Sequence, residues 1–446
     1  MNALSRNASM VIDVGPLDDT QDFECFRAVM LRDRPTEPFV YPPTVYDAHT
    51  ALRLQEASER LCALVADMPS RVFGDDRVAW IEFLGVEHSD EAALLHTALD
   101  DDGLVSAATA FMRPDVLLTD SGFKVVEVNT AAPIGGITHH GPYAEAFMAS
   151  EYRQALAGRS VLATVPDIGP RWLAAFESGL RRATRTGHVF LAIADPTDPN
   201  LGSHYYTRLL RSVGYTVSTG LVSELAFTPH GAVREGRRID AVLTMYTWLE
   251  ACEFVPSQTT RRLLDLHREE RLDLVGSPVS AAYDHKANLE LLTSDAFRQY
   301  LSAEETALVR ELVPATVRVV QSNLDQLLKK REELVLKPGA GYAGIGLTRG
   351  WTCSDAEWRI ALQAAADRDE TYVCQERVRM EPVYTNTDGE PVNVCFGPLV
   401  LMGSYAGTFT RELPKRSGDV VNARAGAIPG AMVVASQASL ESEHQA

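Results

Sequence analysis

The sequence predicts a mixed α/β protein of the α+β kind, and three observations predict it. The first is the run RPDVLLTDSGFKVVEVN at 113–129, in which two alternating apolar segments flank a turn. The second is an alternation of strand-like and helix-like segments from about 159 to 276, which is typical of βαβ units. The third is a series of strand patterns after 334 that is interrupted by a single helical pattern at 355–366.

The composition restricts the classes of partner. The 446 residues carry a formal net charge of -18, which disfavours nucleic-acid binding through bulk charge. The N-terminus lacks the apolar core of a signal peptide, and no run has membrane-spanning length. The six cysteines contain no C-x-x-C pair, which favours reduced thiols over zinc or disulfides. We therefore expect a cytoplasmic protein that binds neither a membrane nor nucleic acid.

The first part of the chain, 1–158, is expected to form an N-terminal lobe that carries the hairpin and a loop after it. Its first 40 residues show no regular pattern. The expected elements are a helix at 46–73, a strand at 78–86 (VAWIEFLGV), a helix at 90–99, the hairpin at 113–129, a loop at 132–143 (APIGGITHHGPY) and a helix to about 156.

The remaining chain is expected to form a small parallel-sheet domain at 159–280, subdomains of mixed structure at 281–434 and a polar, disordered tail at 435–446. In the parallel-sheet domain the expected elements are strands at 160–165, 189–194, 215–221 and 239–245, helices near 171–185 and 204–213, and a hairpin at 229–240. A helical segment at about 285–330 follows.

The hairpin carries four polar side chains that a three-residue loop would place on one face. With Asp120-Ser121-Gly122 as the loop, Asp115 lies opposite Glu127 and Arg113 lies opposite Asn129. Two opposed carboxylates repel unless a cation lies between them, and carboxylate and amide oxygens suit Mg²⁺. Two alternatives stay open: a simply hydrated polar face, or a two-residue loop that moves Asp115 to the other face.

A glycine-rich segment follows a buried strand at 333–346 (ELVLKPGAGYAGIG). Lys337 ends the strand, and Gly339, Gly341 and Gly344 leave room for backbone amides to approach an anion, with Tyr342 between them. The spacing matches a dinucleotide fingerprint, but the next residues predict a strand where that motif needs a helix. We therefore expect a flexible hairpin that covers a phosphate group. An exposed hairpin tip is the structural alternative.

Three further positions are candidates for the same site. In the strand TYVCQERVRM, Gln375, Glu376 and Val378 could form a hinge that contacts a nucleotide base and ribose. Lys286 follows Asp284, which is expected to cap a helix, and only six of the 42 basic residues are lysines. Arg411 lies in the strand TFTREL and could bridge phosphate oxygens. A polar strand end, a solvated lysine and a surface arginine are the structural alternatives.

Taken together, these motifs resemble the ATP-grasp superfamily, and more narrowly its circularly permuted branch, which includes the synthetase domain of glutathionylspermidine synthases. The acidic strand VVEVNTAAP precedes the βαβ segment, which precedes LVLKPGAGYAGIG and YVCQERV. The resemblance implies a permuted ATP-grasp fold, with the small parallel sheet inserted between the acidic hairpin and ATP-binding subdomains at 281–434. The loop with His139-His140 differs from those enzymes, so glutathione and spermidine are not expected as substrates.

The resemblance also implies roles for individual residues. Mg²⁺ would be held by Asp115, Glu127 and Asn129, with Arg113 near the reacting carboxylate and Arg411 near the transferred phosphoryl group. The implied ATP-binding residues are Lys286, Lys337, Gly339, Gly341, Tyr342, Gly344, Gln375, Glu376 and Val378.

The activity implied is ATP-dependent ligation of a small carboxylic acid to an amine through an acylphosphate, with ATP and Mg²⁺ as cofactors. A phosphotransferase on the same scaffold is the runner-up enzyme. A nucleotide-sensing protein without turnover and an NAD-dependent oxidoreductase also stay open. The identity of both substrates is not predicted, nor is substrate contact by His139 or His140, nor the oligomeric state, for which a homodimer is one option.

Overall fold

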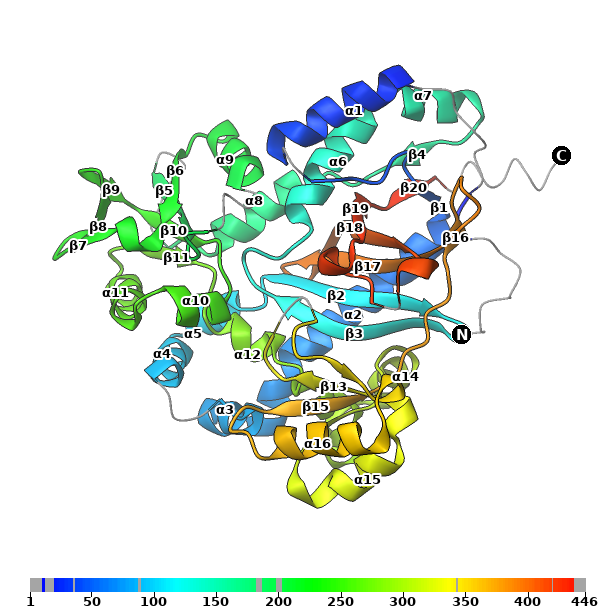
Figure 1. The fold of residues 1–446 in the computed structure, drawn as a ribbon. Coiled ribbons are helices and arrows are strands. Elements are labelled where there is room, and N and C mark those ends of the chain that lie inside the picture. Colours follow the sequence, from blue (N-terminus) through cyan, green and yellow to red (C-terminus); the bar gives the residue numbers. More distant parts are fainter. Residues whose placement is uncertain are drawn as a thin grey trace.

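The structure is a computed structural model that describes residues 10–12, 20–34, 37–86, 90–181, 187–197, 203–341, 344–418 and 420–436. It contains helices and several separate sheets, in agreement with the expected mixed class (Figure 1). Within these ranges, none of the helices combines the length and the apolar character that a membrane span requires.

A six-stranded antiparallel sheet forms the centre of the molecule. Its main path is β19-β18-β17-β2-β3, and β16 pairs with β17 at one end. The long helix α2 (Ala48–Phe73) packs against one face, where Leu61 shares a buried cluster with Val116 and Val394. The strands are β2 (Phe111–Thr119), β3 (Gly122–Thr130), β16 (Tyr384–Thr385), β17 (Pro391–Leu401), β18 (Ser404–Pro414) and β19 (Ile428–Ala431).

The hairpin of β2 and β3 has the expected register at its polar end and a different turn. Asp115 pairs with Glu127 and Arg113 with Asn129, as predicted. However, Thr119 pairs with Gly122, so the loop has two residues instead of the predicted three. A β-bulge follows Asp115 and leaves Val126 as the extra residue of β3. The bulge compensates for the shorter loop, and Asp115 therefore keeps its place opposite Glu127.

A second, parallel sheet has the order β11-β10-β5-β6. Strands β5 (His188–Ile193) and β6 (Thr216–Leu221) confirm two of the expected strands. The expected strand at 239–245 divides into β9 and β10, and the strand expected at 160–165 is the short β4, which pairs with β20 outside this sheet. Strand β11 was not predicted. The remaining bounds are β4 (Ala163–Thr164), β9 (Arg237–Ile239), β10 (Ala241–Thr244), β11 (Asp273–Val275) and β20 (Val433–Ala435).

Helices and a small sheet surround the parallel strands. Helices α8 and α9 confirm the two expected helices, although α8 ends earlier than predicted, and the expected hairpin at 229–240 lies in the three-stranded sheet β7-β8-β9. The bounds are α8 (Gly169–Ser178), α9 (Ser203–Ser212), β7 (Ala226–Thr228), β8 (Gly231–Arg234), α10 (Trp248–Phe254) and α11 (Ser257–Arg268).

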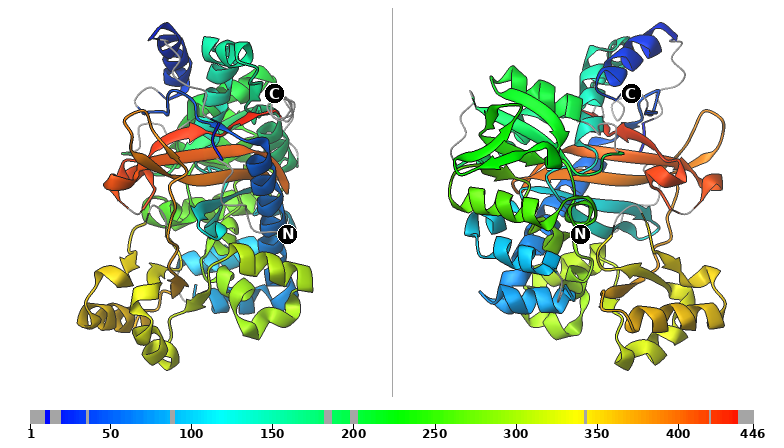
Figure 2. Two further views of the ribbon diagram at one scale, coloured as in Figure 1. Left: turned by 90° about the vertical axis from the view of Figure 1, so that its right-hand side faces the viewer. Right: turned by 60° about the vertical axis from the view of Figure 1, so that its left-hand side comes forward.

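A third sheet, with the order β12-β15-β13-β14, forms a separate lobe (Figure 2). Helix α16 (Asp355–Ala366) matches its prediction and buries Trp358 in a cluster with Leu336 and Cys374. The other elements of this lobe are β12 (Thr316–Arg318), α15 (Leu324–Lys329), β13 (Leu334–Pro338), β14 (Thr348–Arg349) and β15 (Tyr372–Glu376).

The N-terminal lobe differs from its prediction in three places. Helix α1 (Thr20–Asp33) lies where no regular structure was expected. The expected strand at 78–86 is helix α3 (Arg77–Leu84), because the Asp76 side chain caps it through Ala79 N and Gly85 ends it in the left-handed region. Helix α6 (Ile137–Ala149) begins inside the expected loop, even though Pro142 lies within it.

The remaining helices are α4 (Asp90–Leu99), which was predicted, α5 (Asp102–Ala107), α7 (Glu151–Gly158), α12 (Ser280–Asp284), α13 (Asn288–Thr293) and α14 (Ala303–Leu312). At the C-terminal end, Ala435 is buried in β20, which pairs with β4 and with β1 (Val45–Tyr46), so the predicted disorder is wrong at this residue. The prediction for 437–446 concerns residues outside the described ranges.

Candidate active site

Two arginines and a buried aspartate form the centre of the polar face of the large sheet. Arg113 Nε lies 3.0 Å from Asp115 Oδ1, and Arg411 Nη2 lies 2.6 Å from Asp115 Oδ2. Burial alone would raise the pKa of Asp115, but the charges of Arg113 and Arg411 outweigh it and lower the pKa to about 2. Strands β2 and β18 therefore bring a predicted metal ligand and both predicted catalytic arginines into direct contact.

The other two predicted metal ligands adjoin this centre on β3. Asn129 Nδ2 donates to Arg113 O at 3.1 Å and to Asp115 Oδ1 at 3.3 Å. The Glu127 side chain is about one quarter exposed, and its Oε2 lies 3.6 Å from Lys286 Nζ. The described ranges contain no group of three or more His, Cys, Asp or Glu side chains placed to hold a metal ion. The predicted set has two carboxylates, and its third oxygen donor would be the amide of Asn129.

Both candidate lysines contact the rest of this site. Lys286 Nζ donates to Gly341 O at 2.8 Å, in the glycine-rich segment. Lys337 Nζ donates to Gln375 Oε1 at 2.7 Å and to Val126 O, in the β3 bulge, at 3.3 Å. Burial lowers the pKa of Lys337 to about 8, although the charge of Glu127 acts in the opposite direction. The acidic hairpin and the lysine strand, some 200 positions apart in sequence, are thus in direct contact.

The glycine-rich segment lies between the lobe of β12–β15 and the large sheet. Gly339 packs so closely that an added Cβ would lie 2.2 Å from His285 Cε1, while Gly341 and Gly344 have φ of +138° and +73°. A Cβ on Gly344 would be 3.3 Å from Asn422 Nδ2, in the connection between β18 and β19. Glycine is required at these positions by close approach and by backbone conformation. Tyr342, predicted as a nucleotide contact, is outside the described residues.

The predicted hinge residues lie at the end of β15. Gln375 is buried and joins Lys337 to Thr316 Oγ1, to which its Nε2 donates at 3.1 Å. Glu376 is exposed at the strand end, with its backbone N–H bonded to Ala315 O at 2.8 Å, and Val378 lies two residues beyond it. Gln375 therefore contacts a lysine inside the lobe, whereas the Glu376 side chain is exposed at the strand end.

Sequence reasoning missed two contributors to the site. Asp284 was predicted to cap the helix of Lys286, but it ends α12, and its Oδ1 accepts from Thr130 N at 3.2 Å. Burial raises its pKa to about 6, opposed by Lys286 and assisted by Glu127. Cys395 lies opposite Arg411 in the β17–β18 register, with Sγ 3.1 Å from Arg411 Nη2. The register of β17 with β18 decides which residue lies opposite Arg411, and a single sequence does not reveal that register.

The two histidines of the expected substrate loop have different surroundings. His140 is fully buried, and its ring nitrogens face the carbonyl oxygens of Pro166 at 3.0 Å and Thr408 at 3.3 Å. His139 instead contacts Glu37 and Arg34 through Nε2. Just before this helix, Gly135 O accepts from Arg113 Nη1 at 2.6 Å, so the loop is tied to the arginine–aspartate centre.

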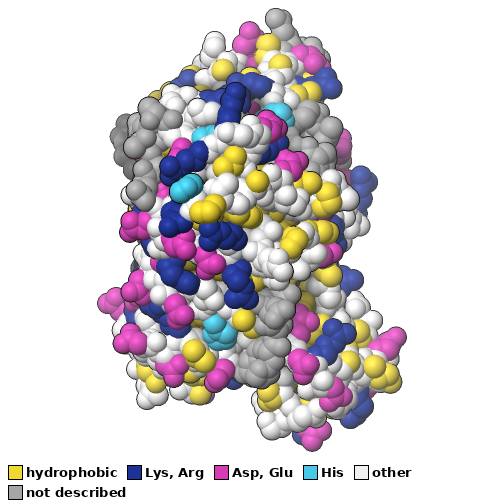
Figure 3. Space-filling view, turned by 90° about the vertical axis from the view of Figure 1, so that its left-hand side faces the viewer, with side chains coloured by type: hydrophobic (Ala, Val, Ile, Leu, Met, Phe, Trp, Pro, Cys, Tyr) yellow, Lys and Arg dark blue, Asp and Glu magenta, His cyan; other side chains and the backbone are white. Residues whose placement is uncertain are grey.

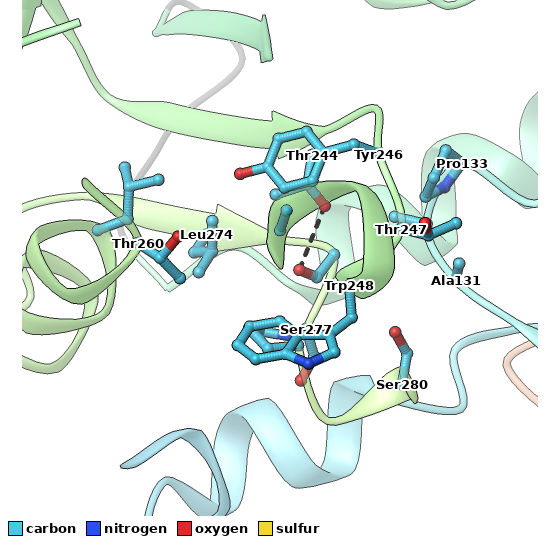
Figure 4. A pocket seen from close by; sticks show the side chains of 15 residues that line it. Ala131, Pro133, Thr244, Tyr246, Thr247, Trp248, Thr260, Leu274, Ser277 and Ser280 are labelled. Carbon is cyan, nitrogen blue, oxygen red and sulfur yellow. Dashed lines mark hydrogen bonds between the residues drawn. The ribbon is translucent and has the colours of Figure 1, made fainter. Parts of the chain in front are cut away.

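A small cavity of about 30 Å³ lies at the carboxyl ends of β10 and β11 (Figure 4). Its wall begins at Ala131, two residues after Asn129, and Thr130 Oγ1 donates to Ser280 O at 2.6 Å beside it. Hydroxyl, apolar and aromatic side chains line it, including Thr244, Tyr246, Thr247, Trp248 and Ser277. On the outer face of this part of the molecule, basic and acidic side chains are intermixed (Figure 3).

Comparison with known proteins places the fold. Neither the collection of family models nor that of curated proteins contains a match. Among solved structures, a glutathione synthetase-like effector (GSS30) from Globodera pallida in its apo form aligns over 93% of this chain and 98% of its own, with a TM-score of 0.54 and 14% identity. The chain therefore has the overall fold of this glutathione synthetase-like effector.

Two partial similarities to other structures are weaker. D-cycloserine synthetase DcsG aligns over 50% of this chain and 67% of its own, with 16% identity and a TM-score of 0.26. A RimK domain ATP-grasp protein from Sphaerobacter thermophilus aligns over 58% of this chain and 95% of its own, with 13% identity and the same TM-score. At these values only the similarity to the effector bears on the fold. The mixed α/β class expected from sequence agrees with the structure, while the ATP-grasp assignment and its permuted order stay predictions.

Proposed function

We propose that this protein is an ATP-dependent carboxylate–amine ligase of the permuted ATP-grasp type. The observation that carries the proposal is the contact between the acidic hairpin and the lysine subdomain. Lys337 reaches the Val126 carbonyl, Lys286 faces Glu127, and Arg411 pairs with Asp115 across the same sheet. One Mg·ATP molecule needs acidic oxygen ligands and phosphate-binding cations within a few ångströms of each other, and this arrangement supplies both.

The donor set suits a triphosphate. Lys337 is a buried ammonium whose two hydrogen-bond acceptors, an amide oxygen and a carbonyl, are both neutral. Arg411 Nε is buried with no hydrogen-bond partner in the described residues. A buried ammonium without an anionic partner and a buried N–H without an acceptor are both costly, and a bound phosphate would satisfy them. Gly339, Gly341 and Gly344 would let the loop cover the phosphates, and the hinge at Gln375, Glu376 and Val378 would contact the base and ribose.

The donor set also admits a divalent ion. Asp115, Glu127 and Asn129 would hold Mg²⁺, because carboxylate and amide oxygens are the ligands that this ion prefers. The ion would neutralise phosphate charge. In the structure both Asp115 oxygens pair with arginines, so a divalent ion would compete with these guanidinium groups for the carboxylate.

The chain's own residues would act by positioning and by charge. Arg113 would orient the substrate carboxylate, whose oxygen attacks the γ-phosphorus of ATP and releases ADP. Arg411 would stabilise the charge that develops on the transferred phosphoryl group. An amine nitrogen would then attack the carbonyl carbon of the acylphosphate, phosphate would leave, and the nitrogen would lose a proton to give the amide. The proposal includes a cytoplasmic location and two small substrates, of which one is a carboxylic acid and the other is an amine.

The test is a substrate screen. Purified protein with Mg·ATP is incubated with pairs of amino acids, short peptides and amines, and ADP release and new amide masses are measured. Amide formation coupled to stoichiometric ADP release supports the ligase. A stable phosphorylated product with no amide supports a phosphotransferase instead.

A nucleotide-binding protein without turnover is the second candidate. The observation that favours it is the double engagement of Asp115 by Arg113 and Arg411, which a divalent ion would have to disrupt. Tight ATP binding without ADP release across the whole screen would support this candidate and contradict the ligase.

A further inference from the structure

His139 has one ring nitrogen in a charged cluster and the other without a partner. It lies in the first turn of α6, and its Nε2 contacts a carboxylate oxygen of Glu37. Arg34 Nη2 lies 3.0 Å from the same nitrogen, bonds the other Glu37 oxygen, and its Nη1 donates to Thr138 Oγ1 at 3.1 Å. His139 Nδ1 is buried, with no hydrogen-bond partner in the described part of the chain. A buried polar atom of this kind calls for a partner that the described residues do not supply.

The contact with Glu37 fixes where the imidazole proton lies. An ionised carboxylate only accepts hydrogen bonds, so we assign the proton of the neutral imidazole to Nε2, which donates it to Glu37. Arg34 Nη2 then donates to Glu37 and not to the ring. Nδ1 is then the nitrogen with the lone pair. The missing partner of His139 must therefore be a hydrogen-bond donor, such as the N–H of an amine or ammonium group.

The position of His139 is next to the candidate active site. Its ring centroid is 5.3 Å from that of Phe409, and the guanidinium carbon of Arg411 is 5.8 Å from the same Phe409 centroid. Phe409 and Arg411 are two residues apart on β18, so they share a face of the sheet. A single phenyl ring thus separates His139 from the arginine assigned to the phosphoryl group. The loop before α6 also bonds Arg113 through Gly135.

We propose that His139 is the general base of amide formation, with Nδ1 accepting a proton from the incoming amine and Glu37 stabilising the imidazolium that results. The inference rests on the proposed ligase function and adds a residue to its second step. The incoming ammonium gives one proton to Nδ1 and becomes a neutral amine, whose nitrogen then forms a bond to the acylphosphate carbon while the bond from that carbon to the phosphate oxygen breaks. The second proton of the nitrogen moves to the leaving phosphate. Phosphate leaves with the electron pair of the broken bond.

The charges that face His139 keep it ready to accept a proton. Burial lowers its pKa, the hydrogen bond and charge of Glu37 raise it, and the positive charges of Arg34 and Arg113 lower it, with a net decrease from the usual value. At neutral pH the ring is therefore neutral, as a base must be before it accepts a proton. Glu37 acts as a positioning residue because it touches the imidazole and not the substrate.

The experiment compares two small nucleophiles that differ in protonation. Methylamine is an ammonium ion at neutral pH and must lose a proton, whereas hydroxylamine is largely unprotonated and attacks acylphosphates without a base. Wild type, His139→Gln and Glu37→Gln are assayed with Mg·ATP and the carboxylic acid that the screen identifies, following ADP, amide and hydroxamate. His49→Gln, an exposed change on α2, is the matched control.

We expect His139→Gln to lose about 10²–10⁴ of the rate with methylamine and to keep the wild-type rate with hydroxylamine. Retained hydroxamate formation also shows that the variant folds and makes acylphosphate. Glu37→Gln should lose less, and the methylamine rate of wild type should fall at acid pH in a step that His139→Gln lacks. Equal losses with both nucleophiles, or no loss with either, would overturn the proposal. If wild type forms neither ADP nor hydroxamate with any acid, the ligase function itself fails.

Discussion

The Asp115 carboxylate is the negative charge at the centre of the site. It is buried and pairs with Arg113 and Arg411, which together hold its pKa near 2. A buried ion pair that loses one partner leaves an uncompensated charge, and such losses typically cost about 3–5 kcal/mol of stability. In this case either arginine can compensate in part for the loss of the other.

The first prediction concerns Arg411. Arg411→Ala should retain ATP binding and lose about 10²–10³ in turnover, because the charge on the transferred phosphoryl group loses a donor while the lysines and glycines remain. Calorimetric ATP affinity and the rate of ADP release measure the two effects separately. Arg411→Lys is the conservative control and should recover part of the rate. Wild-type turnover in Arg411→Ala would reject the assigned role.

The second prediction concerns the buried ammonium of Lys337. Its folded pKa of about 8 lies below the usual 10.5, so the unfolded chain binds more protons between these values and stability rises with pH through that window. ATP binding should show the opposite trend and weaken above about pH 8, since phosphate needs the charged form. Lys337→Met should remove both trends, keep or raise the melting temperature at pH 7, and weaken ATP binding.

Thermal melts and ATP titrations at pH 7 and pH 9.5 check this prediction, with Lys330→Met, an exposed lysine, as the matched control. An ATP affinity of wild type that is constant across this range, or unchanged in Lys337→Met, would contradict it.

For individual residues, the sequence predicted which side chains lie together in the site. It did not predict the further residues that contact them. The opposition of Asp115 and Glu127 was predicted from strand alternation and an assumed three-residue loop, and it is correct although the loop has two residues. Arg34, Glu37 and Cys395 lie in no motif, and they reach the site only through the packing of α1 on α6 and the register of β17 with β18. Contacts of that kind depend on tertiary structure, which a single sequence does not encode in a readable pattern.

Among the elements, the hairpin of β2 and β3 has the predicted pairing of Asp115 with Glu127 but not the predicted loop length. A two-residue loop alone would have turned Asp115 to the other face of the sheet, and the bulge at Val126 restores it. The bulge also frees the Val126 carbonyl to accept from Lys337. Sequence could not reveal it, because Val126 fits an ordinary alternating strand as well as a bulge.

Helix α3 is an element whose predicted secondary structure is wrong. The run VAWIEFLGV is rich in β-branched and aromatic residues, which favours a strand. Capping by Asp76 and the left-handed Gly85 favour a helix, and Trp80, Ile81 and Leu84 are then all buried. Local capping and tertiary burial outweigh the strand propensity of these residues.

The third prediction concerns the segment that carries Lys337 into the glycine loop. In Gly339→Ala the new Cβ would lie 2.2 Å from His285 Cε1 and 2.7 Å from Thr371 O, so the strand must shift. We expect a loss of about 1–3 kcal/mol in unfolding free energy together with weaker ATP binding. Gly158→Ala, where an added Cβ meets open space, is the control and should not lose stability. Chemical denaturation and ATP titration of both variants provide the measurement, and a Gly339→Ala protein like wild type would show that this contact does not position the lysine.

For the whole molecule, the central feature is the meeting of two regions that are far apart in sequence. The hairpin belongs to the large sheet, and Lys337 belongs to the separate β12–β15 lobe (Figure 2). Helices α12 and α13 join the two regions next to the site, with Asp284 at the end of α12 and Lys286 in the connection between the helices. The mixed α/β class could be predicted from sequence patterns, whereas the arrangement of the strands, including β4 outside the parallel sheet, could not.

The measurement that tests this account most directly is the Mg²⁺ dependence of ATP binding in Glu127→Gln. If Glu127 holds the ion beside the lysines, wild type should bind ATP more tightly with Mg²⁺ than with EDTA, and the variant should lose about tenfold or more of its Mg·ATP affinity, ~1.4 kcal/mol. With EDTA the variant should bind ATP as well as wild type or better, because a negative charge near Lys286 is gone.

Calorimetry of wild type, Glu127→Gln and the exposed control Glu82→Gln, each with Mg²⁺ and with EDTA, gives the answer. The account predicts that only Glu127→Gln loses the Mg²⁺ effect. An equal Mg²⁺ effect in all three proteins would contradict the claim that the acidic hairpin and the lysine subdomain bind one Mg·ATP together.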